Sequence, residues 1–488
     1  MKIKLAGYNV DSEILEKLNK SKKEVLTPET FSAAYARISR SSKDVTSLRK
    51  QAKKDIEKAR KSNKTIIFKM GHHSVAEHAV FNFDITGVSR LAIEELEKFR
   101  LSSYTEKSQR YVTLNGDYIT PEEIKDKASI NLFKDTINIQ NSFYRKSLSI
   151  LKKYIFNKYK KLSVTKGNKN LLEGWAKEDA RYILSLATEG QLGLTINARN
   201  LEHLLRRFAL SKRFELIEMR EKIYFIVKKI APSIILFSEP SDFEKDLESS
   251  FKNMFQLNNI DKLNPVNIEP EIIRYTPDAD NIILSSFFSI YEHINFNDAY
   301  NIIERMKKIE KENIFKEMFK NIEFFDTPSR EFEFPDITFQ AGVSASNFAQ
   351  LKRHRMATLI SGKYDLKLGN TIPESIKKNG LEKEFMDIIE KTNKAYFKLK
   401  ERYNETADYI LTNSHRRMVI MKMNLREIYH FIRLRDDEHA QWDIRELANK
   451  LSYKIKKIMP LSSMFLCGKS DFVKEYERIY NYKPKEII

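Results

Sequence analysis

Two segments of the chain, residues 79–88 and 334–343, alternate apolar and polar side chains in the way that predicts half-buried β-strands. The first contains Val80-Phe81-Asn82-Phe83-Asp84-Ile85, whose aromatic and β-branched residues favour a strand. By contrast, Leu91 to Phe99 spaces its apolar residues as one face of a helix does. Lys127 to Tyr159 predicts a long charged helix with an apolar stripe. Strands and helices therefore alternate along the chain.

The same succession of predicted elements occurs twice: an opening strand, a helix, the alternating strand, a helix, a helical pair and a last helix. We therefore expect an α+β fold of two tandem domains, residues 1–238 and 268–488, each a mixed sheet with flanking helices. Residues 239–267 are polar and contain several prolines, which predicts a linker or an irregular crossover. The order of the strands does not follow from the pattern alone.

One short motif also occurs twice, and each copy has lost a different part. Residues 98–111 read KFRLSSYTEKSQRY, and residues 353–366 read RHRMATLISGKYDL. Setting Arg100 on Arg355 also sets the upstream Gly-Val-Ser of 87–89 on that of 342–344. The first copy keeps the end of the motif and the second keeps its beginning. Two half-sites of this kind indicate one composite site.

Composition places the chain among globular proteins. It has 488 residues, of which 41% are hydrophobic and 31% charged, and its mean hydropathy is -0.51. We expect a soluble protein with two or three domains. The single cysteine, Cys467, excludes a disulfide framework and a CxxC metal site.

The sequence predicts no membrane span and no export signal. The most apolar stretch, Ile223 to Phe237, is interrupted by Lys228-Lys229 and Pro232. The first residues, MKIKLAGYNVDSEIL, lack the apolar core of a signal peptide and predict a strand followed by a helix. We therefore expect a cytoplasmic protein.

The formal net charge is +19, which raises the question of anionic partners such as nucleotides, folates or nucleic acids. We favour a simpler interpretation, because the lysines are scattered among glutamates as on ordinary solvated helices. Since no nucleic-acid motif is visible, we rank nucleic-acid binding last. His72, His73, Glu77 and His78 suggest a metal site, but their spacing is not H-E-x-x-H and no third ligand cluster follows, so we expect no metal.

Together the two motif copies resemble RHRxxSxxxxSxR, the signature of the flavin-dependent (alternative) thymidylate synthases. Five further segments are similar to that family, and they span most of both halves. They are GHHSVAEHAVFNFDITGVSR (71–90), EDARYILSLATEG (178–190), INAR (196–199), RYTPD (274–278) and, most specifically, NLREIYHFIRLRDDEHAQWDIRELA (424–448).

The resemblance implies a fold, a reaction and its cofactors. The fold is a twisted sheet with helices, in tetramers whose active sites lie between subunits. The reaction is the reductive methylation of dUMP to dTMP, in which methylenetetrahydrofolate supplies the methylene group, NADPH reduces FAD, and the reduced flavin supplies the hydride. Cys467 lies outside every matched motif, which fits a synthase without a cysteine nucleophile.

The resemblance also implies the residues that bind dUMP, in two groups that we call walls. Arg435 is expected on the uracil edge, where it favours the N3-deprotonated ring, and Ser108 positions and polarises the nucleotide; these two are the predicted catalytic residues. The first wall contains Gln350, Arg353, Arg355 and Arg435, and the second contains Glu106, Ser108, Arg110 and Arg181; Gln109, beside Ser108, is a further predicted dUMP-binding residue.

Each wall has an ordinary structural interpretation as well. The arginines around His354 could be the solvated basic end of a helix. The polar stretch Tyr104 to Gln109 reads as a loop and could be merely a capped one. Arg435 could pair with Asp436 or Glu438 on a salt-bridged helix.

A further set of residues matches family positions that meet the flavin. Asn424, Arg426 and His430 match Asn197, Arg199 and His203, so both repeats keep these three positions. The predicted flavin-binding residues are Ser39, His72, Ser74, Glu77, Glu106, Arg353, His354, Arg355, Asn424, Arg426, His430 and His439.

The losses in the two repeats are complementary. The first repeat carries Glu95, Lys98, Phe99 and Phe208 where the second has Gln350, Arg353, His354 and Arg435, and the second carries Asp365 and Asp408 where the first has Arg110 and Arg181. The same register places Thr327, Ser329 and Phe332 opposite His72, Ser74 and Glu77. We therefore expect a homodimer forming a pseudo-tetramer with two live and two dead sites. The alternative is an inactive or altered-substrate flavin- or nucleotide-binding homologue.

Overall fold

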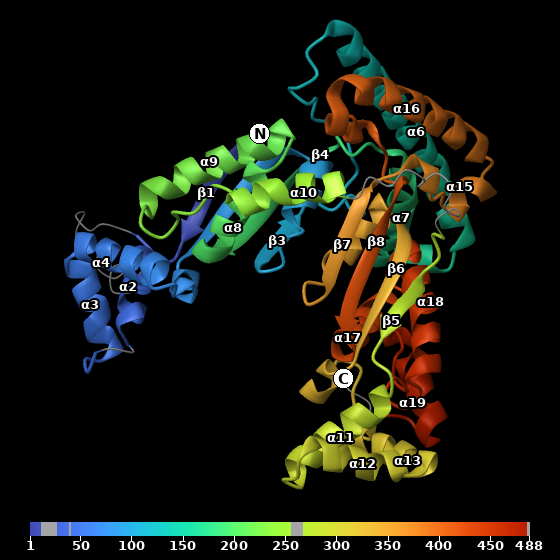
Figure 1. The fold of residues 1–488 in the computed structure, drawn as a ribbon. Coiled ribbons are helices and arrows are strands. Elements are labelled where there is room, and N and C mark those ends of the chain that lie inside the picture. The colour runs from blue at the N-terminus through green and yellow to red at the C-terminus, as the bar shows by residue number, and fades with distance from the viewer. Residues whose placement is uncertain (11–26, 39–40, 255–266, 486–488) are drawn as a thin grey trace. The chain divides into compact units, whose positions relative to one another are not determined.

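The computed structural model describes residues 1–10, 27–38, 41–254 and 267–485 (Figure 1). The chain divides into two compact units. Unit 1 contains residues 1–264 and 373–412, and unit 2 contains residues 265–372 and 413–488.

Unit 1 is built on a four-stranded sheet in the order β1-β2-β4-β3 (Figure 1). All three strand pairs are antiparallel. The strands are β1 (Lys2–Tyr8), β2 (Val80–Ser89), β3 (Ser102–Glu106) and β4 (Glu189–Asn197). Within residues 1–264, the helices of unit 1 are α2 (Glu29–Ile38), α3 (Val45–Lys54), α4 (Ile56–Asn63), η1 (Lys64–Lys69), η2 (His73–His78), α5 (Arg90–Leu96), α6 (Lys127–Lys158), η3 (Leu162–Val164), α7 (Lys166–Ala180), η4 (Arg181–Ile183), α8 (Ala198–Ala209), α9 (Phe214–Ile230) and α10 (Asp242–Met254).

Unit 2 repeats the same sheet in the order β5-β6-β8-β7, again with antiparallel pairs throughout. Its strands are β5 (Glu271–Tyr275), β6 (Asp336–Ser344), β7 (Thr358–Tyr364) and β8 (Arg416–Asn424). Its helices are α11 (Ala279–Tyr291), α12 (Phe296–Arg305), α13 (Lys308–Phe319), η6 (Arg330–Glu333), α14 (Ala345–Leu351), η7 (Leu366–Leu368), α17 (Leu425–Arg435), α18 (Trp442–Ile458), η9 (Lys469–Asp471) and α19 (Phe472–Tyr480). The α+β class is confirmed, but the sheets are antiparallel rather than mixed.

Every second side chain of the central strands is buried, which explains why the strands form where the sequence alternates apolar and polar residues. Phe81, Phe83 and Ile85 of β2 are all at most 1% exposed and pack in one apolar cluster with α8 and α9. The corresponding face of β6, with Ile337 and Phe339, packs in a cluster that includes α17 and α18. One face of each sheet therefore forms the core, and helices that follow the last strand cover it.

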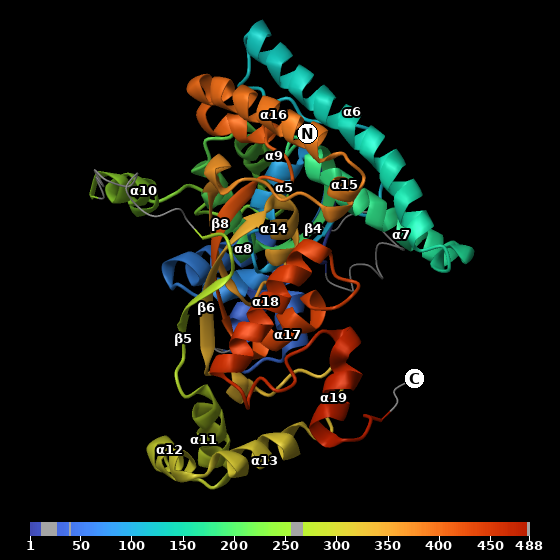
Figure 2. The same cartoon turned by 90° about the vertical axis from the view of Figure 1, so that its right-hand side faces the viewer.

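The compact units depart from the predicted repeat boundaries in one respect. Residues 373–412 of the second repeat, which carry α15 (Glu374–Lys378), α16 (Glu382–Tyr403) and η8 (Asn404–Ile410), belong to unit 1. Figure 2 shows α16 lying along α6, and Phe143 of α6 meets Phe385 of α16 edge to face at 5.8 Å. The buried Gln140 donates from Nε2 to Thr392 Oγ1 at 2.9 Å and to Ile410 O at 3.0 Å. Apolar packing and buried hydrogen bonds thus join the two repeats inside unit 1.

The predicted linker, residues 239–267, is only partly irregular. Within it the structure describes helix α10 (Asp242–Met254), whose first turn carries Asp242 and Glu244. Acidic residues there stabilise a helix through its dipole, which the proline-based expectation did not consider. The helix expected after the opening strand falls partly in 11–26, outside the described residues.

A bulge in β2 shifts the register between the repeats. Thr86 pairs with Gln191 and Val88 with Gly190, so Gly87, at φ 67°, is an extra residue in β2. β6 pairs with β8 without interruption from Asp336 to Ser344. Residues upstream of Gly87 therefore match second-repeat residues one position later than the ungapped register predicted, and Gly342 is not the counterpart of Gly87.

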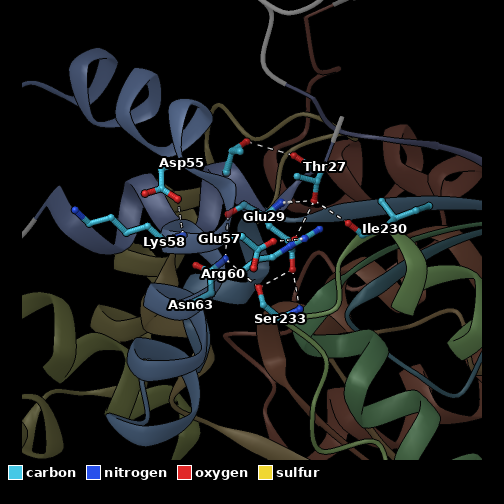
Figure 3. A network of polar contacts seen from close by, with 10 residues as sticks. Thr27, Glu29, Asp55, Glu57, Lys58, Arg60, Asn63, Ile230 and Ser233 are labelled. Atoms are coloured by element: carbon cyan, nitrogen blue, oxygen red, sulfur yellow. Dashed lines mark hydrogen bonds and ion pairs between the residues drawn. The ribbon is translucent and has the colours of Figure 1, made fainter. Parts of the chain in front are cut away.

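The carboxylate of Glu29 ties the helices α2–α4 to the segment after α9 (Figure 3). It is fully buried and accepts hydrogen bonds from Arg60 Nε at 2.7 Å, Ser233 N at 2.7 Å and Ser233 Oγ at 2.5 Å. Thr27 Oγ1 donates to Ile230 O at 2.9 Å beside it. A buried carboxylate is tolerated because its oxygens are satisfied by these donors.

Candidate functional site

A chain of polar side chains in unit 2 holds Arg435, the last residue of α17. Its Nε donates to His354 Nε2 at 2.9 Å, and the other ring nitrogen, Nδ1, lies 3.3 Å from Glu427 Oε1. His354 follows α14 and is 4% exposed, and Glu427 lies in the first turn of α17 and is 9% exposed. Burial, followed by the charges of Arg435 and His430, lowers the pKa of His354 well below its usual range. The imidazole is therefore neutral and accepts from Arg435.

Gln350 supports the same guanidinium from α14. Arg435 NH1 donates to Gln350 Oε1 at 3.4 Å, and Gln350 Nε2 donates to Gln441 Oε1 at 3.3 Å. Gln441 caps the N-terminus of α18 by accepting from Ile444 N at 3.4 Å. Two predicted ligand residues, Gln350 and Arg435, are thus brought together, and the beginning of α18 fixes them.

A serine N-cap sets the position of α14. Ser344 Oγ accepts from Asn347 N at 3.0 Å and donates to Asp443 Oδ2 of α18 at 2.5 Å. Ser89 does the same for α5 with Ala92 N at 3.0 Å and Glu215 Oε2 of α9 at 2.6 Å. The serine shared by both repeats therefore has a structural role, since it links the short helix before the motif to a later helix.

The two motif arginines on either side of His354 have exposed side chains. Arg353 and Arg355 both lie in the turn between α14 and β7, and the buried His354 separates them. Guanidinium groups in such a turn present planar donors that match phosphate oxygens.

The second wall lies in unit 1, where β3 ends and a turn begins. Glu106 is the last residue of β3 and pairs with Leu192, and Lys107 N donates to Gln191 O at 2.9 Å. The stretch Tyr104 to Glu106 was expected to be a loop; it is a strand because β4 offers it a complete edge of hydrogen-bonding groups. Ser108 and Gln109 lie in the turn that follows.

Arg110 is bound to Glu178, whose charge also acts on Arg181. Arg110 Nε donates to Glu178 Oε2 at 2.5 Å, and Ser108 Oγ accepts from Arg110 N at 3.2 Å. Burial lowers the pKa of the Arg181 guanidinium; the charge of Glu178 raises it, and the charge of Arg110 lowers it further. Arg181 stays protonated, because the pKa of a guanidinium is far above neutral. Two guanidinium groups that act on each other, with one carboxylate beside them, form a setting that suits an additional anion.

The predicted flavin segment forms η2 and the residues before it. His72, Ser74 and Glu77 are exposed, and Arg199 NH1 is bound to Glu77 Oε1 at 2.5 Å. Ser39 lies outside the described residues.

The second repeat keeps one part of this segment that sequence comparison had assigned as lost. Arg426 NH1 is bound to Glu333 Oε1 at 2.9 Å, and Arg426 Nε donates to Pro328 O at 2.7 Å. Because of the Gly87 bulge, the counterpart of Glu77 is Glu333 and not Phe332. The assignment of Thr327, Ser329 and Phe332 was wrong by one residue; Pro328, Arg330 and Glu333 stand opposite His72, Ser74 and Glu77.

The three remaining predicted flavin residues lie on or beside α17. Asn424 is the N-cap of α17 and accepts from Glu427 N at 2.8 Å, as Asn197 caps α8 through Asn200 N at 2.9 Å. His430 is exposed, and its ring lies 5.8 Å from that of His354. His439 is also exposed, and its Nδ1 lies 2.9 Å from Asp437 Oδ1. Capping alone therefore accounts for the presence of the asparagine in both repeats.

The first repeat fills the position of the Arg435 cluster with apolar rings. Phe99 and Phe208, the counterparts of His354 and Arg435, meet edge to face at 6.0 Å. Glu95, the counterpart of Gln350, is bound to Lys98 Nζ at 2.8 Å. This half-site has exchanged its polar groups for packing and for an ion pair.

The charge at Asp408 is also neutralised within unit 1. Asp408 Oδ2 is bound to Arg213 NH2 at 2.6 Å, and Arg213 NH1 lies 4.0 Å from Glu95. Burial alone would lower the pKa of Arg213, but the charge of Asp408 and then that of Glu95 raise it overall. Asp408, the counterpart of Arg181 in the second repeat, therefore has a structural role: its ion pair with Arg213 joins η8 to the start of α9.

Sequence reasoning missed three residues that hold the predicted ligands: Glu427, Gln441 and Glu178. Glu427 and Gln441 lie inside the most specific family-like segment, and Glu178 opens another, but a segment match does not tell which members contact each other. Among the described residues, no three His, Cys, Asp or Glu side chains gather as a metal site. The described helices include none that is both long and apolar enough to cross a bilayer.

Comparison with known proteins places these observations in a family. The family model of the thymidylate synthase complementing protein matches residues 23–233 and 271–461, once in each repeat. A UPF0159 protein of Thermoplasma acidophilum is 24% identical over 435 residues, which cover 81% of this chain and 86% of the relative. A flavin-dependent thymidylate synthase of Clostridium tetani is 34% identical over 180 residues, which cover 36% of this chain and 69% of the relative.

A solved structure of another protein also matches part of this chain. Thymidylate synthase X from Helicobacter pylori, with FAD and dUMP, matches 49% of this chain and 99% of its own, at 19% identity and a TM-score of 0.30. The family model covers most of the chain in two consecutive matches, as a tandem duplication requires. The chain belongs to the family of thymidylate synthase complementing proteins, the flavin-dependent thymidylate synthases.

Proposed function

We propose that the protein is a flavin-dependent thymidylate synthase, which converts dUMP to dTMP with methylenetetrahydrofolate, NADPH and FAD in a composite site. One observation carries the proposal: the two repeats have lost complementary halves of the motif. Decay without selection would remove residues from both walls of each site. The two retained walls instead provide together one complete set of the predicted dUMP-binding residues, with Arg435 from the second repeat and Arg110 from the first.

In this proposal each wall has its own task. Arg435 polarises the uracil ring, because a permanently charged guanidinium stabilises negative charge that develops on the base. Arg110 and Arg181 bind the phosphate, and Ser108 orients the nucleotide in the turn between them. No protein nucleophile is needed. The buried Cys467 fits this view, since burial raises its pKa to about 11 and leaves the thiol protonated.

The donors around the motif fit a flavin dinucleotide. Arg353 and Arg355 are exposed guanidinium groups that suit pyrophosphate oxygens, and the exposed His430 suits a ring or carbonyl contact. When bound, the flavin would supply the hydride that reduces the transferred methylene group to a methyl group. The chain's own residues bind and orient the nucleotide.

Assembly and location belong to the same proposal. Two chains would form a homodimer equivalent to the tetramer of single-repeat relatives, with two live sites and two in which Phe99 and Phe208 replace the ligand residues. The protein would act in the cytoplasm, where its nucleotide and folate substrates are found.

The alternative is a family member that has lost synthase activity or acts on another nucleotide. The observation in its favour is that the full-length relatives from Thermoplasma acidophilum and Chlamydia muridarum are named only as UPF0159 proteins. A changed substrate would keep the arginine walls and alter the contacts to the base or the folate.

One assay separates the two. Purified protein is incubated with dUMP, methylenetetrahydrofolate, NADPH and FAD, and dTMP is measured, with single omission of FAD and of the folate as controls. Formation of dTMP that stops on either omission would establish the synthase. Protein that binds FAD and dUMP but forms no dTMP would refute it in favour of the alternative.

A further inference from the structure

We propose that Glu427 is a positioning residue for Arg435 and acts through the neutral imidazole of His354. The inference rests on the proposed function, in which Arg435 contacts the base. It adds a residue to that site that the motif resemblance did not single out. In this proposal, hydrogen bonds from Arg435 to His354 and from His354 to Glu427 fix the direction of the Arg435 guanidinium group.

The bonding pattern assigns the tautomer of His354. A guanidinium group has donors only, so the 2.9 Å contact from Arg435 Nε requires a lone pair on His354 Nε2. The proton of the neutral ring must then be on Nδ1, which lies 3.3 Å from Glu427 Oε1. Glu427 is therefore the acceptor that selects the tautomer able to receive Arg435.

The relay is held rigidly within unit 2. The ring of His354 packs edge to face against Phe431 at 4.8 Å, and Asn424 fixes the backbone of Glu427 by accepting from its N–H at 2.8 Å. Without an acceptor at Glu427, the ring could move its proton to Nε2. An N–H group would then face the N–H of Arg435, and the guanidinium would turn away.

The first repeat provides an internal comparison. Asn200 occupies the position of Glu427, while Phe99 and Phe208 occupy those of His354 and Arg435, so the three positions have changed together. Two phenylalanine rings suffice to fill that space in unit 1. Burying a carboxylate and an imidazole beside a half-buried guanidinium costs desolvation that packing alone would not require. The second repeat therefore keeps the relay for the orientation of Arg435.

The test uses full-length Glu427→Leu, which removes the acceptor, and Glu427→Gln, whose amide oxygen can still accept from Nδ1. The matched control is Asn200→Leu, at the equivalent helical position of the first repeat. Two readouts are the dissociation constant for dUMP and the tautomer of His354. The latter is read by solid-state NMR of protein with 15N-labelled histidine rings, with His354→Gln assigning the signal among the nine histidines.

We expect Glu427→Leu to weaken dUMP binding about tenfold, the size typical of a supporting partner, and to shift His354 to the Nε2–H tautomer. Glu427→Gln should stay within about threefold of wild type and keep the Nδ1–H tautomer, and Asn200→Leu should bind normally. Folded Glu427→Leu with wild-type affinity, or weaker binding without a tautomer change, would overturn the relay. Failure of the wild type itself to bind dUMP would overturn the proposed function and, with it, the role of Arg435.

Discussion

Ser185 of the first repeat and Thr412 of the second, which are counterparts, pair with each other in an antiparallel β-bridge inside unit 1. Leu186 N donates to Leu411 O at 2.7 Å, and Ala187 N donates to Tyr409 O at 2.9 Å beside it. The bridge and these two hydrogen bonds join equivalent segments of the two repeats within unit 1. The duplicated halves therefore share a core at this point.

This pairing predicts that the first repeat cannot fold alone. A chain of residues 1–238 lacks the partners of Leu186 and Ala187 and exposes the face of α6 that packs on α16, so we expect it to be insoluble or molten. Co-expression with residues 239–488 should rescue it, because the second fragment supplies 373–412. Soluble yield and near-ultraviolet circular dichroism are the measurements. A well-folded 1–238 fragment would contradict the shared core.

The sequence was sufficient for the repeat and for most element types, because both depend on local periodicity; the strand β3 and the helix α10 were the exceptions. Burial of Phe81 and Phe83 follows directly from the alternation. The register upstream of Gly87 did not follow, since a bulge adds one residue to a strand without changing the apolar pattern on either side. For that reason the ungapped comparison paired Glu77 with Phe332, although Glu333 makes the equivalent contact to Arg426.

The candidate site, like the fold, could be predicted from the sequence only in part. Family resemblance selected Gln350 and Arg435, which the structure brings within 3.4 Å of each other. It did not select Glu427 or Glu178, because a supporting carboxylate is recognised by its distance to a ligand residue and not by a spacing in the chain. Nor did it predict that Asp408 would be bound to Arg213, a contact between repeats far apart in sequence.

Substitution of one arginine in each wall tests the composite site. Arg110→Ala and Arg435→Ala should each lower the rate of dTMP formation by at least about a hundredfold, since each removes a charged donor to the nucleotide. Lys98→Ala, in the degenerate half-site, is the control and should leave the rate near that of wild type. Mixing the two inactive variants should restore little activity if both walls come from one chain. Strong rescue, with subunit exchange verified, would place the live site between chains.

Replacement of Glu29 should release the helices α2–α4 from the rest of unit 1. In Glu29→Ala, Arg60 loses its buried partner and Ser233 loses its acceptor, for which we expect a loss of about 3–5 kcal/mol. Glu57→Ala is a matched control, because Glu57 also binds Arg60, at 2.9 Å, but its side chain is 83% exposed. That change should cost less than about 1 kcal/mol.

Hydrogen exchange is the measurement for Glu29. Amides of α2–α4 should exchange faster in Glu29→Ala than in Glu57→Ala, while those of β2 and β4 stay protected. Equal protection of α2–α4 in both variants would show that Glu29 does not hold these helices.

We expect the stability of unit 2 to depend on pH through the carboxyl group of Asp436. Burial raises the pKa of this carboxyl to about 6; Asp471 also raises it, while Asn449, Lys456 and Arg445 lower it. As the C-cap residue of α17, its negative charge also faces the negative end of the helix dipole. The folded state thus binds the proton more tightly than the unfolded chain, whose carboxyl has a pKa near 3.8. The group's contribution is favourable at low pH and is lost as the pH rises through about 4 to 6.

Asp436→Asn removes this titration and keeps an oxygen that can accept from Asn449. Compared with wild type, the variant should have nearly the same stability at pH 4 and should be more stable at pH 8. Because the carboxyl is partly solvated, the gain should be on the order of 1 kcal/mol. Glu438→Gln, at an exposed acid of the same 580 Å³ cavity, is the control and should show no such pH-dependent difference. Chemical denaturation at the two pH values measures the free energy of unfolding. A gain in stability of the same size at pH 4 would show that ionisation of the Asp436 carboxyl is not the cause.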